Sequence, residues 1–201
     1  VAMIERMDQR IDEILKTLET SGLANNTVVF FASDNGGTKS ARNAPFSGFK
    51  GSTMEGGIRV PAIIRWPGKI PAGMVSDQPC ITFDLTASMA RLAGVEPAVD
   101  QPFDGMDVLQ HVIERRQDVP RTLFWRKPRG ETVWSATRDG DLKYVSQLVG
   151  DRREEYLYDL ATDPGEQSDL KKVRAGDFER LKKSYLVWEE TVRRNRRGRP
   201  E

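Results

Sequence analysis

Cysteine is almost absent from this chain, whose only cysteine is Cys80. A single cysteine cannot form an internal disulfide, so the sequence does not indicate an oxidising or a reducing compartment. Cys80 lies between a proline and an apolar run, without the electropositive setting that a reactive thiolate needs, and we expect a buried, inert thiol. No apolar run approaches the roughly 20 residues that cross a bilayer, so we predict no membrane span.

Neither sign of charge dominates. The 201 residues include 31 lysines and arginines and 30 aspartates and glutamates, so net charge does not indicate nucleic acid as a partner. The amino terminus has no signal peptide, and Val1 already lies inside a predicted helix. We therefore expect the chain to be a fragment, or its gene model to be cut short upstream, which leaves the localisation unknown.

The segment from Thr27 to Pro61 contains the strongest candidate for a ligand-binding or active site. An apolar run, 28–32, is typical of a strand buried on both faces in a parallel sheet, and it ends at Ser33, Asp34 and Asn35. Ligands of open α/β sheets bind beyond the carboxyl ends of such strands. A carboxylate beside a carboxamide supplies two hard oxygens, which suit Mg²⁺ or Ca²⁺ better than zinc.

Other interpretations of this segment are weaker. Asn35-Gly36 is a strong hairpin dipeptide, but the residues that follow it do not read as a partner strand. The ligands of an EF-hand alternate along the chain, whereas these two are adjacent. Lys50 precedes Gly51, Ser52 and Thr53, an order that excludes a Walker A loop but leaves a lysine placed to attract a tetrahedral oxyanion. Glu55 and Arg59 are four residues apart and are predicted to pair and brace the loop.

Periodicity predicts two regions, 1–119 and 120–201. The first region begins with an amphipathic helix over 2–21, which has an Asp12–Lys16 pair and is followed by a left-handed Gly22. Its later elements are a second buried strand at 62–66, a helix over 82–92, and a short helix capped by Asp107. The second has short strands at 122–125, 132–138, 142–148 and 155–158, with a hairpin turn at 139–141. A final helix, with apolar residues from Phe178 to Val192, is predicted to cover one face of this antiparallel sheet.

Three segments in this order resemble the carboxy-terminal half of the formylglycine-dependent sulfatases: AMIERMD, LETSGLANNTVVFFASDNGG and FKGSTMEGGIRVPAIIRWPG. The later LYDLATDPGEQSDL is similar to the closing motif of that family. The resemblance covers nearly the whole chain. It implies an alkaline-phosphatase-like α/β sandwich followed by a small antiparallel β subdomain that a carboxy-terminal helix covers.

The resemblance also implies roles for three residues. Asp34 and Asn35 match the ligands of one divalent cation, usually Ca²⁺, and Lys50 matches the lysine that contacts the substrate sulfate and assists catalysis. The family's nucleophile comes from a C/S-x-P/A-x-R motif oxidised to formylglycine, and this motif is absent because Cys80 is followed by Ile81, Thr82 and Phe83. We therefore expect the 201 residues to be inactive without the amino-terminal half of the domain.

Three functions follow from these observations. The first is hydrolysis of a sulfate monoester, such as a sulfated carbohydrate or an aryl sulfate, by a complete protein of which this chain is part. The second is a phosphodiesterase or phosphonate hydrolase of the same superfamily, and the third is a non-catalytic interaction module. Resemblance alone favours a periplasmic or secreted location.

Overall fold

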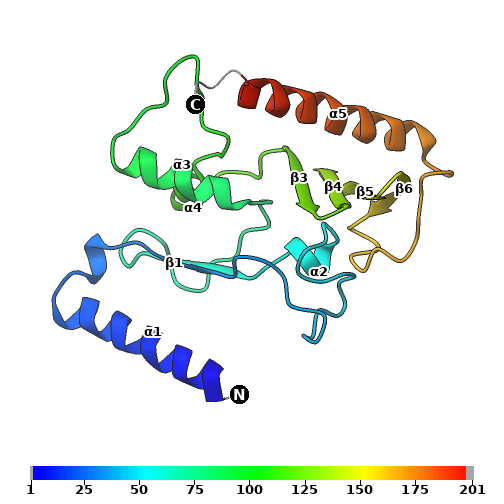
Figure 1. Cartoon of the computed structure of the whole chain (residues 1–201). Coiled ribbons are helices and arrows are strands. Elements are labelled where there is room, and N and C mark those ends of the chain that lie inside the picture. The colour runs from blue at the N-terminus through cyan, green and yellow to red at the C-terminus, as the bar shows by residue number, and fades with distance from the viewer. Residues whose placement is uncertain (1, 198–201) are drawn as a thin grey trace. The chain divides into compact units, whose positions relative to one another are not determined.

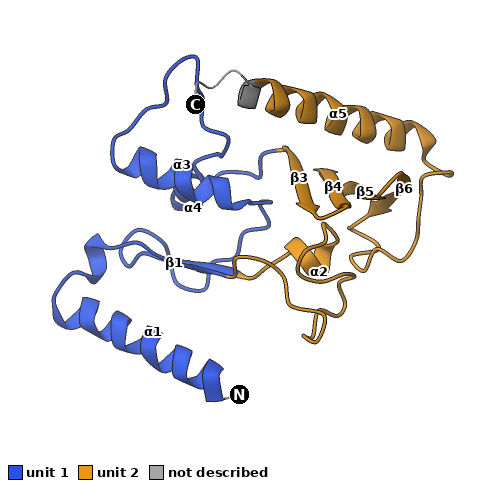
Figure 2. Cartoon of the chain, viewed as in Figure 1, with its two compact units in different colours: residues 1–32, 62–119 blue, residues 33–61, 120–201 orange. Residues whose placement is uncertain are grey.

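The computed structural model describes residues 2–197, with no description of the side chains of 195–197. The chain forms two compact units (Figure 2), the first made of residues 1–32 and 62–119 and the second of residues 33–61 and 120–201. The chain therefore leaves the first unit, contributes one long segment to the second, and returns. This segment, 33–61, contains the residues that the sequence singled out.

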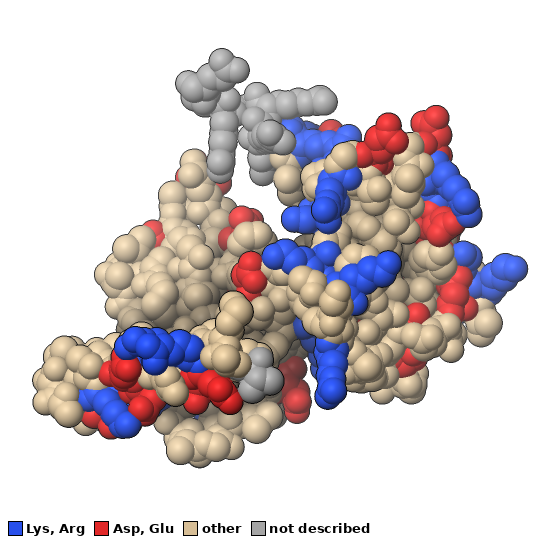
Figure 3. All heavy atoms as spheres, turned by 60° about the horizontal axis from the view of Figure 1, so that its bottom comes forward, with Lys and Arg blue, Asp and Glu red and all other residues tan. Residues whose placement is uncertain are grey.

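The first unit begins with helix α1, Ala2–Thr20, followed by the short 3-10 helix η1, Ala24–Asn26. Gly22 has a φ of 69°, which confirms the left-handed residue predicted after the helix, and Lys16 Nζ lies 2.7 Å from Asp12 Oδ2 as expected. On the face shown in Figure 3, acidic and basic side chains alternate along α1. No residue of α1 is buried. Among the described residues, no helix is long and apolar enough to cross a membrane.

Two strands of the first unit pair with each other, in a direction that the sequence did not predict. Strand β1, Val29–Ala32, and strand β2, Ala62–Arg65, form an antiparallel two-stranded sheet in which Val29 faces Arg65. The run 28–32 predicted a strand buried on both faces in a parallel sheet, and this prediction is wrong: β1 pairs antiparallel, and no residue of β1 or β2 is buried. An unbroken apolar run does not show what covers the strand, and it carries no information about strand direction, which is decided by where the segment 33–61 brings the chain back.

Helices α3, Thr82–Leu92, and α4, Val108–Ile113, complete the first unit. Both were predicted, and the cap is confirmed because the Asp107 carboxylate accepts a hydrogen bond from the Gln110 N–H at 3.0 Å. The prediction of a buried Cys80 is wrong: its side chain is exposed. It lies in an irregular stretch where Gln78 is buried instead, and its Sγ donates to the Gln78 carbonyl oxygen at 3.1 Å.

The second unit contains a four-stranded antiparallel sheet in the order β3-β4-β5-β6. The strands are Thr122–Arg129, Thr132–Asp139, Leu142–Val149 and Arg152–Asp159, each longer than predicted, and the turn between β4 and β5 has Gly140 at a φ of 59°. Helix α5, Ala175–Arg197, lies across one face of the sheet (Figure 1). The segment 33–61 contributes the short helix α2, Glu55–Ile58.

The sheet of the second unit is covered on both faces. On one face, Leu142, Tyr144 and Leu157 pack against Leu181 and Tyr185 of α5. The other face has the cluster of Ala136, Val145, Tyr158 and Leu160, against which Met54 from the segment 33–61 packs. Strand β5 is consequently buried on both sides over its first five residues. The sequence predicted that the carboxy-terminal helix covers one face of this sheet, but it did not predict that the segment 33–61 packs on the other face.

Candidate functional site

Backbone hydrogen bonds join the two parts of the segment 33–61 that the sequence singled out. The Gly36 N–H donates to the Gly57 carbonyl oxygen at 2.9 Å, and the Lys50 N–H donates to the Gly37 carbonyl oxygen at 2.8 Å. A further bond of 2.6 Å runs from the Gly56 N–H to the Ser47 carbonyl oxygen. The two glycines that follow Asp34-Asn35 are therefore hydrogen-bonded directly to Gly57 and to Lys50.

Glycine is required where these peptides meet. A Cβ placed on Gly36 would overlap the Gly56 carbonyl oxygen, and a Cβ on Gly56 would overlap the Ser47 and Gly48 carbonyl oxygens. Gly51, directly after Lys50, has a φ of 102°, a conformation that side chains rarely adopt. We refer to residues 47–59 as the Lys50 loop. Its glycines allow backbone contacts that any side chain would block.

The three predicted site residues differ in exposure. Asp34 and Lys50 are exposed and Asn35 is half-buried. Ser33 orders the turn because its hydroxyl donates to the Asn35 carbonyl oxygen at 2.8 Å. Within the described part of the chain, no three His, Cys, Asp or Glu side chains gather as a metal site. Asp34 and Asn35 supply two oxygen donors of the kind that Ca²⁺ and Mg²⁺ prefer, so this pair fits part of a coordination shell rather than all of it.

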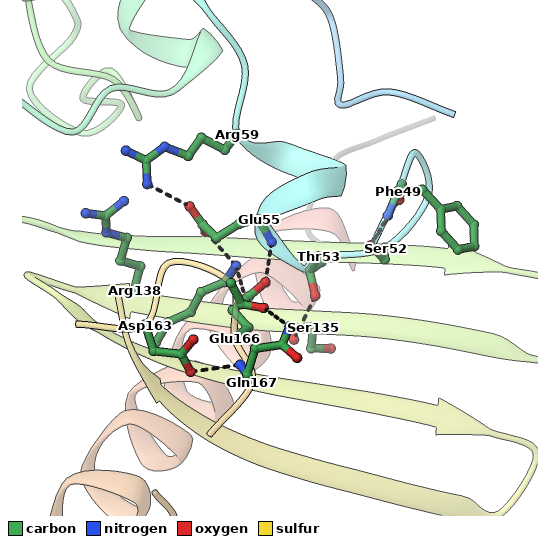
Figure 4. Close-up of polar contacts among 12 residues, drawn as sticks. Phe49, Ser52, Thr53, Glu55, Arg59, Ser135, Arg138, Asp163, Glu166 and Gln167 are labelled. Atoms are coloured by element: carbon green, nitrogen blue, oxygen red, sulfur yellow. Dashed lines mark hydrogen bonds and ion pairs between the residues drawn. The ribbon is translucent and has the colours of Figure 1, made fainter. Parts of the chain in front are cut away.

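Ser52 and Thr53 fix the Lys50 loop from within. The Ser52 hydroxyl donates to the Phe49 carbonyl oxygen at 3.0 Å, next to Lys50 (Figure 4). The Thr53 hydroxyl reaches out of the loop and donates to the Ser135 carbonyl oxygen of β4 at 3.2 Å. Both side chains are buried. These bonds attach the peptide after Lys50 to the antiparallel sheet.

A buried ionic cluster lies beneath the Lys50 loop, and sequence reasoning missed it. Lys143 Nζ in β5 lies 2.7 Å from Glu55 Oε1 and 2.8 Å from Glu166 Oε1. The Lys143 side chain is fully buried, and Glu55 and Glu166 are buried with it. Arg59 Nη1 is 3.5 Å from Glu55 Oε2, which confirms the predicted pair. We call Glu55, Lys143 and Glu166 the buried triad.

Burial dominates the electrostatics of the triad. Desolvation raises the pKa of the Glu166 carboxyl above its ordinary value, although the Lys143 ammonium and the Glu55 N–H both act to lower it. One sequence signal could have identified Lys143. Lys143 lies between Leu142 and Tyr144 in a strand, so its side chain points to the face of the sheet opposite α5. A lysine that is fully covered on that face needs a carboxylate as its partner. The sequence did not predict that the segment 33–61 covers this face, and so it did not predict that Lys143 needs a carboxylate partner.

The sulfatase family model matches residues 1–95 of the chain. N-acetylgalactosamine-6-sulfatase from Sus scrofa is 33% identical over 217 residues, which cover 92% of this chain and 41% of that protein. Steryl-sulfatase from Rattus norvegicus is 34% identical over 66% of this chain and 27% of its own length. The chain belongs to the sulfatase family. It spans about two fifths of the length of the pig relative and corresponds to the carboxy-terminal part of such proteins.

Solved structures share the fold of this chain. Ps i-CgsB in complex with k-i-k-neocarrahexaose superposes with a TM-score of 0.80 at 27% identity, over 92% of this chain and 41% of that one. The phosphonate monoester hydrolase of Agrobacterium radiobacter shares the fold, with a TM-score of 0.65 at 22% identity over 96% and 40% of the two chains. The predicted fold class is confirmed: part of an alkaline-phosphatase-like α/β sandwich with a small antiparallel subdomain and its carboxy-terminal helix.

Proposed function

We propose that this chain forms the carboxy-terminal part of a sulfatase that hydrolyses sulfate monoesters, and that it contributes cation and sulfate ligands to the active site. The observation that carries the proposal is the pair of backbone bonds from Gly36 to Gly57 and from Lys50 to Gly37. These bonds hold two oxygen ligands and one ammonium group on a single glycine-rich framework. Family membership supports the same function.

In this proposal, Asp34 and Asn35 hold one divalent cation, Ca²⁺ or Mg²⁺. When bound, the cation supplies positive charge that polarises the sulfate group. Because Ca²⁺ takes six to eight oxygens, we propose that residues outside this chain, together with water, supply the remaining ligands. The nucleophile also has to come from outside, since the chain has no C/S-x-P/A-x-R motif. We therefore propose that the 201 residues are inactive by themselves.

Lys50 is proposed to neutralise a sulfate oxygen as negative charge develops on it. A lysine charge about 4 Å from a unit negative charge is worth roughly 4 kcal/mol at an effective dielectric constant near 20, before desolvation. The exposed side chain of Lys50 is free to reach a substrate, while its N–H and the peptides around it are fixed. Mobility is thus limited to the four-carbon stem.

The test uses the chain joined to the residues that precede Val1 in its gene. We expect hydrolysis of an aryl sulfate, and we expect Lys50→Ala to lower kcat by about 10²–10³-fold, as removal of one charge-stabilising donor does. Lys39→Ala is the matched control, because Lys39 is an exposed lysine of the same segment. If Lys50→Ala hydrolyses the ester as fast as Lys39→Ala, Lys50 does not contact the sulfate.

Calorimetry tests the cation ligands separately. In the extended protein we expect Ca²⁺ binding that Asp34→Ala weakens at least tenfold, because a charged oxygen ligand is lost. Asp151→Ala, in an exposed turn of the second unit, should leave binding unchanged. Equal binding by both variants would remove Asp34 from the metal site. A stable chain that neither binds Ca²⁺ nor gains activity on extension would favour the non-catalytic interaction module.

A phosphonate or phosphodiester substrate is the second candidate. It is favoured by the shared fold with the phosphonate monoester hydrolase. Sulfate and phosphonate groups are both tetrahedral oxyanions, and an ammonium group attracts either of them. Parallel assays with an aryl sulfate and an aryl phosphonate distinguish the two: the preferred substrate is the one with the higher kcat/KM in the extended protein.

A further inference from the structure

The buried triad joins the Lys50 loop to the antiparallel sheet at one point. Glu55 belongs to the loop, Lys143 to β5, and Glu166 to the turn after β6, and the Glu55–Glu166 link spans 111 positions of the sequence. We propose that Lys143 and Glu166 are positioning residues that hold Glu55, and through it fix the Lys50 loop in the conformation that sulfate binding requires. The catalytic part of this inference rests on the proposed function, whereas the anchoring of the loop by the triad is independent of it.

The geometry shows how the anchor acts on the loop. Glu55 is the first residue of α2, and its N–H donates to Glu166 Oε2 at 2.7 Å, while its carboxylate accepts from Lys143. Glu55 is thus held by its backbone and by its side chain at once. The Gly57 carbonyl, two residues later, accepts from Gly36, next to the proposed cation ligands. A shift of Glu55 therefore reaches Gly36, beside the proposed cation ligands, through two peptides and one hydrogen bond, and it reaches Lys50 through the next bond, from the Lys50 N–H to the Gly37 carbonyl oxygen.

Glu166 is held in an unusual backbone conformation, which is a second observation in favour of the proposal. Its φ is 56°, in the left-handed region that costs a residue with a side chain free energy. The Asp163 carboxylate stabilises the turn by accepting from the Gln167 N–H (Figure 4) and from the Ser168 N–H, each at 2.8 Å. Strained residues persist where the surroundings fix them, and they gather at sites with a function.

The charge balance of the triad makes Lys143 indispensable. Two carboxylates share one ammonium, and all three side chains are at most 3% exposed. Removing one partner of a buried ion pair leaves the other charge desolvated and uncompensated, which is much more damaging than losing an exposed pair. Loss of Lys143 leaves Glu166 without its cation and leaves Glu55 only the longer contact of 3.5 Å with the half-exposed Arg59, so we expect the loop to detach from the sheet while α5 still covers the opposite face.

Amide hydrogen exchange on the 201-residue chain tests the anchor. In Lys143→Met we expect the Lys50, Gly56 and Gly57 amides, each of which donates a backbone hydrogen bond, to exchange at least tenfold faster than in the wild type. Lys182→Met is the control, because Lys182 pairs with Glu155 at 2.9 Å on the side of the sheet that α5 covers. We expect its loop amides to exchange at the wild-type rate. Unchanged loop exchange in folded Lys143→Met would overturn the proposal.

A milder variant decides the question if Lys143→Met does not fold. Glu166→Gln keeps an acceptor for the Glu55 N–H and removes one charge, and we expect about threefold to tenfold faster exchange of the same loop amides. Exchange at the wild-type rate in folded Glu166→Gln would then overturn the proposal. Strand amides of β4 and β5 serve as the internal reference for global opening, because faster exchange there as well means unfolding rather than loop release.

An activity measurement separates positioning from general stability. In the extended protein, at a temperature where every variant is fully folded, we expect Lys143→Met to lower kcat for the aryl sulfate by about tenfold to a hundredfold, with Lys182→Met unchanged. A kcat equal to that of the wild type would overturn the catalytic part of the inference. If the wild-type protein hydrolyses no sulfate ester, the proposed function fails, and the exchange experiment still decides whether the triad anchors the loop.

Discussion

At the scale of single residues, the glycines of the Lys50 loop and of the Asn35 turn are the least replaceable. A Cβ on Gly36 would overlap the Gly56 carbonyl, whereas a Cβ on Gly176, in α5, meets nothing within 4 Å. We expect Gly36→Ala to lower the free energy of unfolding by about 1–3 kcal/mol, the cost of overpacking. Gly176→Ala should raise it by up to about 1 kcal/mol through helix propensity. Urea unfolding followed by circular dichroism measures both, and a loss in both variants would contradict the geometry.

Thr53 provides a second prediction at this scale. Its side chain is 1% exposed, and its hydroxyl donates to the Ser135 carbonyl oxygen. Thr53→Val keeps the shape and removes the donor, so we expect a loss of about 1–2 kcal/mol in the free energy of unfolding. Thr53→Ser keeps the donor and should restore most of the hydrogen-bond contribution. If the valine variant proves as stable as the serine variant, this hydrogen bond does not stabilise the loop.

At the scale of elements, helix α5 has one buried and one exposed side. Leu181 is fully buried against the sheet, and Leu186 is 49% exposed. We expect Leu181→Ala to lower the free energy of unfolding by about 2–5 kcal/mol, the usual cost of a truncated core leucine. Leu186→Ala should change it far less. Thermal unfolding of the two variants measures the difference, and similar losses would mean that the helix packs through another face.

The turn after β6 makes the stability of the second unit depend on pH. Burial acts to raise the pKa of Asp169, but the Lys171 and Leu157 N–H groups and the Lys171 ammonium outweigh it and hold the pKa below its usual value. A lowered pKa contributes stability above the unfolded value of about 3.9, and this stability is lost as pH falls through the folded pKa.

Asp169→Asn tests this dependence because the amide oxygen still accepts hydrogen bonds while the charge is gone. We expect its melting temperature to lie below that of the wild type at neutral pH, with the difference shrinking as the pH falls below about 4. The control is Asp151→Asn, in the exposed turn between β5 and β6. A difference that stays constant from pH 7 to pH 3 would show that the charge of Asp169 does not stabilise the turn.

Elements with a strong local signal could be predicted from the sequence. Helix α3 begins and ends where its periodicity predicts, and the Asp139-Gly140-Asp141 turn joins β4 to β5. The direction of the β1–β2 pair could not be predicted, and for Lys143 the strand alternation gives the face of the sheet but not the segment that buries it. Both depend on where a long irregular segment packs, and no local pattern encodes that path. The candidate site was found through Asp34, Asn35 and Lys50, whereas the residues beneath it were not.

At the scale of the molecule, the segment 33–61 connects the proposed active-site residues to the carboxy-terminal subdomain, because both lie in the second compact unit. The proposed cation and sulfate ligands lie in the same compact unit as the antiparallel sheet, although β1 and β2, directly before and after them, belong to the other unit. The closing sequence LYDLATDPGEQSDL has a physical role in this arrangement, because it contains Glu166 of the buried triad. A carboxy-terminal subdomain is thereby connected to the loop on which catalysis is proposed to depend.

Helix α1 leads to the last prediction. Its apolar residues Met3, Ile4, Met7 and Ile14 are 87%, 68%, 49% and 58% exposed. An exposed apolar stripe of this kind normally marks a contact surface. In the proposed function, the occupant is the part of the sulfatase domain that lies outside these 201 residues. We therefore expect the 201-residue chain to bind the dye ANS and to self-associate in analytical ultracentrifugation, and the extended protein to do neither.

The double variant Ile4→Lys and Ile14→Lys assigns the effect to this helix. It should reduce both ANS fluorescence and association of the 201-residue chain, because charge on the stripe opposes its burial against a second copy. Val173→Lys adds one lysine, half the charge of the double variant, at an 83% exposed position of the second unit and should reduce neither. In the extended protein the double variant should instead lower the melting temperature, since the lysines would then be buried. Unchanged stability there would mean that α1 stays exposed in the complete domain.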